Sequence, residues 1–214
     1  MLKAAMSYQK FLSMNIKEAL GARDPQIIKD CQQSGYRHAG VLLPILVEGG
    51  LCKVLLTRRT DRVAHHKGQI SFPGGAVDRG DGSIEETVLR ETYEEIGLSR
   101  EHIEILGRID DALTLASNYL IHPLVGHITA IDDFTINKAE VAGIIKVPLS
   151  LFRREDAERR PYSVEYDGVE YETPAYKYHS DLIWGATARM MENFMDIIGN
   201  KLCLPLLQKY TMFS

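Results

Sequence analysis

The chain has 214 residues, of which 45% are hydrophobic and 25% are charged, and these proportions are ordinary for one globular domain. The formal net charge of -4 gives no overall positive field, so nucleic acid is not indicated as a partner. No apolar run reaches the length of a transmembrane helix, and no membrane partner is expected. The three cysteines, Cys31, Cys52 and Cys203, are scattered and indicate reduced thiols, so the cytoplasm is the expected location.

The first 34 residues mix short apolar patches with turn formers such as Gly21 and Pro25. This pattern predicts one or two helices that cover the main body. We therefore expect a helical extension over residues 1–34 and a main domain over residues 35–214.

From Ala39 onward the pattern changes to β-rich runs. Two of these runs flank Gly49 and Gly50, which is typical of a β-hairpin. Further strands are predicted for three runs that read ILGRIDDALT, YLIHPLVGHITAI and EVAGIIKVPL. Together with the helices, these strands indicate a protein of the α/β class.

Two helices stand out after the first strands. The first is predicted from Ser83, which can form a capping box with Glu86, to Gly97, the residue best able to take a left-handed C-terminal conformation. The second is predicted from Asp181 to Ile198, because its apolar residues recur with helical spacing.

Aromatic residues near the C-terminus leave two interpretations open. Trp184 can stack on a nucleobase, but on an apolar helix face a place in the core is favoured. Tyr162, Tyr166 and Tyr171 alternate with polar residues, which favours a packed hairpin over the lining of a substrate pocket.

The first predicted helix carries Glu91, Glu94 and Glu95 within an arc of about 100°. Like charges at this spacing cost helix stability, and the dipole disfavours negative charge in the last turn. A hard divalent cation such as Mg2+ or Mn2+ would offset this charge, whereas zinc fits poorly because Cys and His do not cluster here. The alternative is a solvated acidic face.

A glycine-rich loop, SFPGGAVDRGDGS, directly precedes the acidic helix. Gly74 and Gly75 allow its backbone to approach a ligand closely. The order is Gly75, five residues, Asp81, eight residues, then RETYEEIGL from Arg90. This string resembles the Nudix box, a loop–helix–loop signature that binds a metal-diphosphate. It departs from the common form in Asp81, in the spacing of eight residues, and in Thr92.

The resemblance implies the Nudix fold, in which a mixed β-sheet is sandwiched between α-helices, and hydrolysis of a diphosphate linkage. It implies Glu91, Glu94 and Glu95 as ligands of Mg2+ or Mn2+, with Arg90 orienting a carboxylate. The proton acceptor is left open between a glutamate of the box and Glu140 in a later loop. Gly74 and Gly75 would help to fix the acidic loop beside the substrate.

Residues 55–75, LLTRRTDRVAHHKGQISFPGG, are similar to the extra signature of the coenzyme A pyrophosphatase branch of this family. This resemblance implies cleavage of coenzyme A or a derivative to 3′,5′-ADP and 4′-phosphopantetheine. Thr60 and Ala64 depart from the signature, and Ala64 provides no cation where the branch has its second arginine. ADP-ribose, NADH and dinucleoside polyphosphates stay open as other substrates. A non-catalytic nucleotide-sensing module is a further alternative.

A basic run precedes the glycine loop and can hold phosphates opposite the metal. Its candidate substrate-binding residues are Arg58, Arg59, Arg62 and Lys67. Arg62 or Lys67 can replace the guanidinium missing at Ala64, while a solvated strand edge is the alternative for each residue. The partner implied is a small nucleotide diphosphate, and members of the family can be homodimers.

Overall fold

The computed structural model describes residues 2–28, 35–60, 68–114, 117–129, 134–153, 160–166 and 168–199. In chain order, its elements are α1 (Leu2–Gly21), β1 (Arg37–Glu48), β2 (Leu51–Arg59), β3 (Ile70–Ser71), β4 (Gly74–Ala76), α2 (Ile84–Ile96), η1 (Arg100–His102), β5 (Ile103–Arg108), β6 (Ala112–Leu113), β7 (Tyr119–Ile128), β8 (Val141–Pro148), η2 (Leu149–Phe152), β9 (Arg160–Tyr166), β10 (Val169–Tyr178), β11 (Asp181–Trp184) and α3 (Gly185–Ile198).

Strand β1 lies at the centre of a mixed sheet, to which eight strands of the described part belong. It pairs antiparallel with β2 through the hairpin at Gly49 and Gly50, and parallel with β7. The path runs β3-β2-β1-β7-β5, while β4 pairs with β1, β6 with β7 and β8 with β2. The predicted hairpin is thus confirmed, and the parallel pair joins strands far apart in the sequence.

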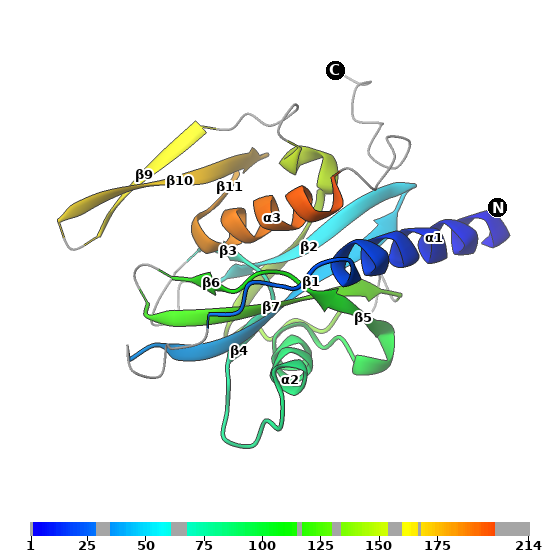
Figure 1. The fold of residues 1–214 in the computed structure, drawn as a ribbon, viewed down its shortest axis with the longest axis horizontal. Coiled ribbons are helices and arrows are strands. Elements are labelled where there is room, and N and C mark those ends of the chain that lie inside the picture. Colours follow the sequence, from blue (N-terminus) through cyan, green and yellow to red (C-terminus); the bar gives the residue numbers. More distant parts are fainter. Residues whose placement is uncertain are drawn as a thin grey trace.

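Helices cover both faces of this sheet. Figure 1 shows α1 and α3 on one face and α2 on the other. The side chains of β1 alternate between the two faces. Leu43 and Ile45 belong to the larger core cluster, whereas Leu46 belongs to the smaller cluster with Ile96 of α2. This arrangement confirms the predicted α/β fold with a mixed sheet between helices.

Within residues 2–28, the described part of the N-terminal segment, the chain forms one helix, α1, that packs on the main body. Leu12, Ile16 and Leu20 are buried in the same core cluster as Phe194 of α3. Among the described residues, no helix combines the length and apolar character that crossing a membrane requires.

Two predicted boundaries were wrong. The C-terminal helix begins at Gly185 and not at Asp181, because Asp181–Trp184 pairs with β10 as strand β11. Gly185 has a φ of 67°, which separates the strand from the helix. The run ILGRIDDALT forms two strands, β5 and β6, because it is interrupted where the carboxylate of Asp110 accepts hydrogen bonds from Asn193 and from the backbone of Gln26.

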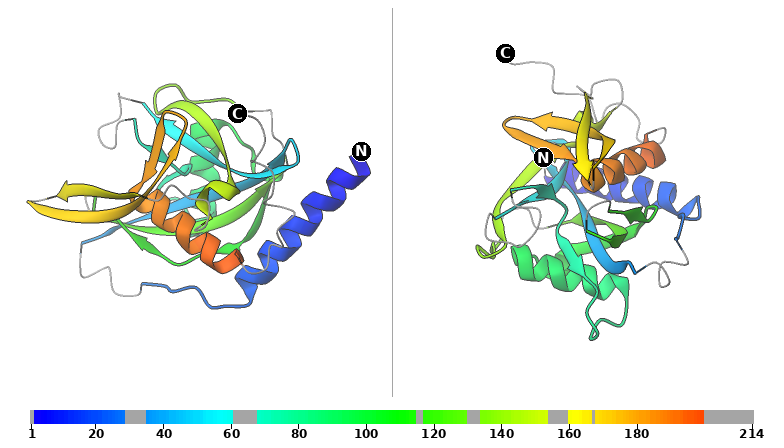
Figure 2. Two further views of the ribbon diagram at one scale, coloured as in Figure 1. Left: turned by 90° about the horizontal axis from the view of Figure 1, so that it is seen from above. Right: turned by 90° about the vertical axis from the view of Figure 1, so that its left-hand side faces the viewer.

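A second sheet of the described part consists of β11, β10 and β9. The antiparallel pairing of β9 with β10 confirms the predicted hairpin. The hairpin of β9 and β10 extends away from the main sheet in Figure 1 and in the left view of Figure 2.

Candidate active site

Helix α2 has well-defined caps at both ends. The Ser83 hydroxyl accepts a hydrogen bond from the Glu86 backbone N–H at 3.2 Å, as the capping box predicts. The Glu86 carboxylate accepts from the N–H of Gly82 at 2.7 Å, one residue earlier than that motif requires. Gly97 ends the helix with a φ of 69°, and its N–H donates to the Tyr93 carbonyl. The caps fix where the acidic residues lie.

The glycine pair of β4 lies directly against this helix. A Cβ atom at Gly74 would collide with the carbonyl oxygen of Gly40, and the φ of Gly74 is 148°. A Cβ atom at Gly75 would collide with the carboxylate of Glu91. The missing side chain at Gly74 therefore lets β4 pair closely with β1, and the missing side chain at Gly75 leaves room for Glu91 of the acidic helix.

Glu95 is the most buried carboxylate of the site, with only 2% of its surface exposed. Burial raises its pKa to about 7, although the N–H of Gly74 and the nearby charge of Arg59 act in the opposite direction. The Gly74 N–H donates to Oε2 at 3.2 Å, and a guanidinium nitrogen of Arg59 lies 3.7 Å from Oε1. Glu95 is thus a buried acid whose charge is only partly compensated.

Arg90 holds the other carboxylates of the loop and helix. Its Nε and Nη2 atoms donate to the two oxygens of Asp81, each at 2.9 Å. Its Nη1 donates to Glu91 at 2.8 Å and lies 3.3 Å from Glu94. These hydrogen bonds hold the pKa of Asp81 well below its usual range. The role of Arg90 in orienting a carboxylate stays a prediction, and these hydrogen bonds are the contacts through which it would act.

Glu91 and Glu94 differ in their surroundings. The Glu91 side chain is 16% exposed, and burial raises its pKa. The Glu94 side chain is 54% exposed and faces solvent. Glu140 lies in the turn before β8, and its charge raises the pKa of both Glu91 and Glu95, so it lies close to the acidic edge. The backbone N–H of Thr60 donates to the Glu140 carbonyl and fixes that turn against the end of β2.

The donor set suits a hard divalent cation, because it consists of carboxylate oxygens with an excess of negative charge. Among the described residues, the site contains five carboxylates and only two guanidinium groups. The carboxylates are those of Asp81, Glu91, Glu94, Glu95 and Glu140, and the guanidinium groups are those of Arg59 and Arg90. In the described part of the chain, no three acidic, His or Cys side chains are already arranged around one point as metal ligands. Binding of one cation by three of these carboxylates therefore requires their side chains to converge further than they do here.

Not every predicted substrate-binding residue lies in this group. Arg58 donates through Nη2 to both oxygens of Asp181, at 2.7 and 2.8 Å, so it joins β2 to β11. Adjacent strand residues face opposite sides, and of the two described arginines Arg59 is the one that approaches the acids. Arg62 and Lys67 lie outside the described residues.

The expectation for Trp184 was wrong, and Thr87 is an addition to the predicted site. Trp184 lies on a strand and not on a helix face, partly exposed, with its ring centroid 5.3 Å from that of Tyr162. Sequence reasoning missed Thr87, whose hydroxyl donates to Asp81 at 2.8 Å and helps to hold the carboxylate that Arg90 grips. Thr87 lies four residues after Ser83, on the same face of the helix. This spacing could have indicated that its hydroxyl points back toward the loop.

This chain is similar in sequence to known Nudix hydrolases and in structure to a solved protein of that family. It is 38% identical over 165 residues to a Nudix hydrolase named NudL from Photorhabdus laumondii, covering 72% of this chain and 81% of that one. It is 25% identical over 206 residues to Nudix hydrolase 3 of Caenorhabditis elegans, covering 89% and 84%. A solved structure of a MutT/nudix family protein from Enterococcus faecalis matches with a TM-score of 0.51 and 16% identity, covering 86% of this chain and 68% of that one.

A mixed sheet between helices, with a glycine strand held against a capped acidic helix, defines an α/β protein built around a loop–helix–loop. The family model described as the NUDIX domain matches residues 36–162. The chain therefore belongs to the Nudix superfamily and is a hydrolase that acts on pyrophosphate bonds. Enzymes of this family act on small nucleotide derivatives and generally use divalent cations.

Proposed function

We propose that this Nudix hydrolase cleaves the diphosphate linkage of coenzyme A or one of its derivatives, giving 3′,5′-ADP and 4′-phosphopantetheine. The observation that carries the chemistry is the acidic edge of α2, with buried Glu95 directly beside the glycine pair of β4. The substrate class is supported by the sequence of residues 55–75, whose LLT and FPGG segments resemble the coenzyme A branch.

Glu91, Glu94 and Glu95 are the proposed ligands of Mg2+ or Mn2+. The pKa of about 7 at Glu95 supports this assignment, because a cation would replace the proton that burial favours. When bound, the cation supplies a Lewis acid that neutralises diphosphate charge and makes a nearby water easier to deprotonate.

The remaining residues have positioning and proton-accepting roles. Arg90, fixed by Asp81, orients the Glu91 and Glu94 carboxylates. Gly74 and Gly75 let the diphosphate approach the helix. A box glutamate or Glu140 accepts the proton of the attacking water at a carboxylate oxygen.

Phosphate binding is assigned to the basic residues around the end of β2. Of the candidates that the structure describes, Arg59 lies nearer the acids, and Arg62 and Lys67 are proposed to extend the same contact. The pairing of Arg58 with Asp181 favours an indirect role, in which it holds the second sheet beside the site.

The deciding experiment is a substrate panel with Mg2+ or Mn2+, in which mass spectrometry identifies the products. We expect 3′,5′-ADP from coenzyme A, with slower turnover of ADP-ribose, NADH and dinucleoside polyphosphates. Equal or faster turnover of any of these would contradict the proposed preference. Saturable nucleotide binding without products in any metal would indicate a sensing module instead.

Glu94→Gln tests the metal site. We expect it to lower kcat by roughly a hundredfold or more, while Glu85→Gln, an exposed change on the first turn of the same helix, leaves kcat near the wild-type value. Retained turnover in Glu94→Gln would exclude the assignment.

The protein is also proposed to act in the cytoplasm as a homodimer, and light scattering measures that oligomeric state.

A further inference from the structure

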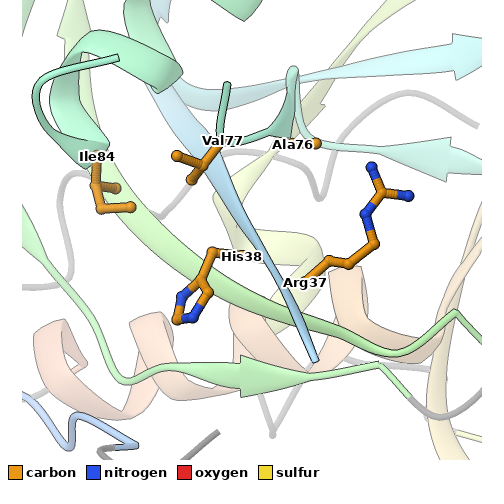
Figure 3. Close-up of a pocket in the computed structure, with 5 residues that line it drawn as sticks. All are labelled: Arg37, His38, Ala76, Val77 and Ile84. Carbon is orange, nitrogen blue, oxygen red and sulfur yellow. The ribbon is translucent and has the colours of Figure 1, made fainter. Parts of the chain in front are cut away.

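A hollow of about 510 Å³ opens beside the first turn of α2, within the size range of ligand pockets. It is lined by Arg37, His38, Ala76, Val77 and Ile84. Figure 3 shows the His38 ring below Val77 and Ile84, and the Arg37 guanidinium extending toward Ala76. The hollow thus combines an apolar wall with two basic side chains.

His38 is the outer end of a hydrogen-bonded chain that runs into the protein. Its Nδ1 lies 2.8 Å from Nε2 of His122, and the two rings are nearly parallel, with 11° between their planes. Nδ1 of His122 lies 2.9 Å from Oδ1 of Asp111, whose side chain is fully buried. The backbone N–H of Ile28 donates to the other oxygen of Asp111 at 3.0 Å. Each group is therefore held by the next.

The order of this chain determines which nitrogen of His38 is available to a ligand. The carboxylate of Asp111 only accepts hydrogen bonds, so Nδ1 of His122 carries its hydrogen toward Asp111. Nε2 of His122 is then the acceptor for the Nδ1 hydrogen of His38. Nε2 of His38 has no hydrogen-bond partner in the part of the chain that the structure describes.

The charges around the hollow favour an anion. Arg108 already pairs with Asp111, so that carboxylate does not leave an uncompensated negative charge behind the histidines. Arg37 is exposed, lies 5.0 Å from the centroid of the Tyr119 ring, and forms no ion pair with any described acidic residue. The described residues that line the hollow include no carboxylate.

A phosphomonoester matches these groups. A guanidinium binds two phosphate oxygens at once. An imidazole can share a proton with a third oxygen, because histidine and the second ionisation of a phosphomonoester have ordinary pKa values of about 6 to 6.5. Glu91 lies seven positions after Ile84 on the helix, so the hollow lies about 10 Å along the helix from the acidic edge. This separation is comparable with the size of a nucleotide unit.

We propose that Arg37 and His38 bind a phosphomonoester group of the substrate while its diphosphate lies at the acidic edge of α2. This inference rests on the proposed hydrolysis of a nucleotide diphosphate. It adds a specificity site for substrates that carry a third, terminal phosphate. His122 and Asp111 are positioning residues, since they fix the ring of His38 without touching the ligand.

Matched substrates test the site, because coenzyme A and 3′-dephospho-coenzyme A differ only in one phosphomonoester. Arg37→Gln and His38→Gln should each lower kcat/KM for coenzyme A by about tenfold or more, through KM, and leave 3′-dephospho-coenzyme A within about twofold. Arg100→Gln, an exposed change just beyond the other end of α2, is the matched control and should alter neither. Equal losses on both substrates, or no loss, would overturn the inference.

A binding measurement separates this inference from the proposed activity. By calorimetry, 3′,5′-ADP should bind the wild-type protein about tenfold more tightly than 5′-AMP does, and Arg37→Gln should remove this difference. Failure of catalysis with the difference intact would contradict only the proposed activity. Absence of the difference in the wild-type protein would overturn the phosphomonoester site. Since Arg37 is exposed, its variant stays informative even if His38→Gln unfolds.

Discussion

Arg90 sets the positions of the acidic side chains at the edge of α2. Its guanidinium contacts Asp81, Glu91 and Glu94, and it also donates to the Ala76 carbonyl at 3.2 Å. The contact with Asp81 is the most extensive, because both carboxylate oxygens accept a hydrogen bond. Asp81 thus acts on the glutamates through Arg90, which explains why an aspartate at this position is compatible with the site.

Asp81→Asn should lower the free energy of unfolding by about 2 kcal/mol, less than for a fully buried pair because Arg90 is partly exposed. The pKa of Asp81 is depressed in the folded protein, so its stabilising effect is present above its unfolded value of 3.8 and is lost as the pH falls below it. Urea denaturation between pH 6 and pH 2 measures both effects. Asp78→Asn, an exposed change in the same loop, is the control. A variant with unchanged acid sensitivity would contradict this account.

At the scale of elements, the loop, β4 and α2 form one unit. The helix begins and ends at local signals, Ser83 and Gly97, which the sequence alone revealed. The position of the unit on the sheet depends on β4, which pairs with β1 from Ala39 to Val41. The sequence contains no local signal for this pairing, because a three-residue strand has no periodicity to read.

Gly75→Ala should lower kcat by about a hundredfold while the protein stays folded, because the added Cβ would displace the Glu91 carboxylate. Gly80→Ala, in the same loop, should have no effect, since a Cβ there has no atom within 4 Å. Steady-state kinetics and circular dichroism of both variants make the comparison. Normal activity in Gly75→Ala would show that Glu91 need not occupy its present position.

At the scale of the whole molecule, α1 belongs to the central core. Ile16 and Leu12 are fully buried against residues from the sheet and α3. The expected division at residue 34 stays a prediction about domains, but the packing of α1 is that of an integral helix.

Removal of a core side chain from α1 tests this view. Ile16→Ala should lower the free energy of unfolding by about 3 kcal/mol, whereas Met14→Ala, at a position that is 61% exposed, should change it by less than about 0.5 kcal/mol. Chemical denaturation gives both values. Similar small effects would indicate that α1 is a detachable extension.

Metal binding should also stabilise the whole fold. A cation that binds only the folded protein adds about 2.7 kcal/mol at one hundred times its dissociation constant. Thermal unfolding with and without Mg2+ should therefore show a higher midpoint in the wild-type protein and no shift in Glu95→Gln. An equal shift in both proteins would place the cation elsewhere.

The sequence by itself determined the acidic helix, its caps, the hairpin of β1 and β2, and the alternation of the strands, because each depends on residues that are close along the chain. The predicted start of α3 was wrong because the short run Asp181–Trp184 fits either a strand or a helix when it is read locally. Its pairing with β10, which lies outside that run, makes it a strand.

Only the tertiary structure decided which charges meet. In the folded chain, Arg59 lies near Glu95 and Arg58 pairs with Asp181. His38 contacts His122 across the parallel pair of β1 and β7. These contacts link residues from distant strands, and their electrostatic effects depend on burial that no local pattern specifies.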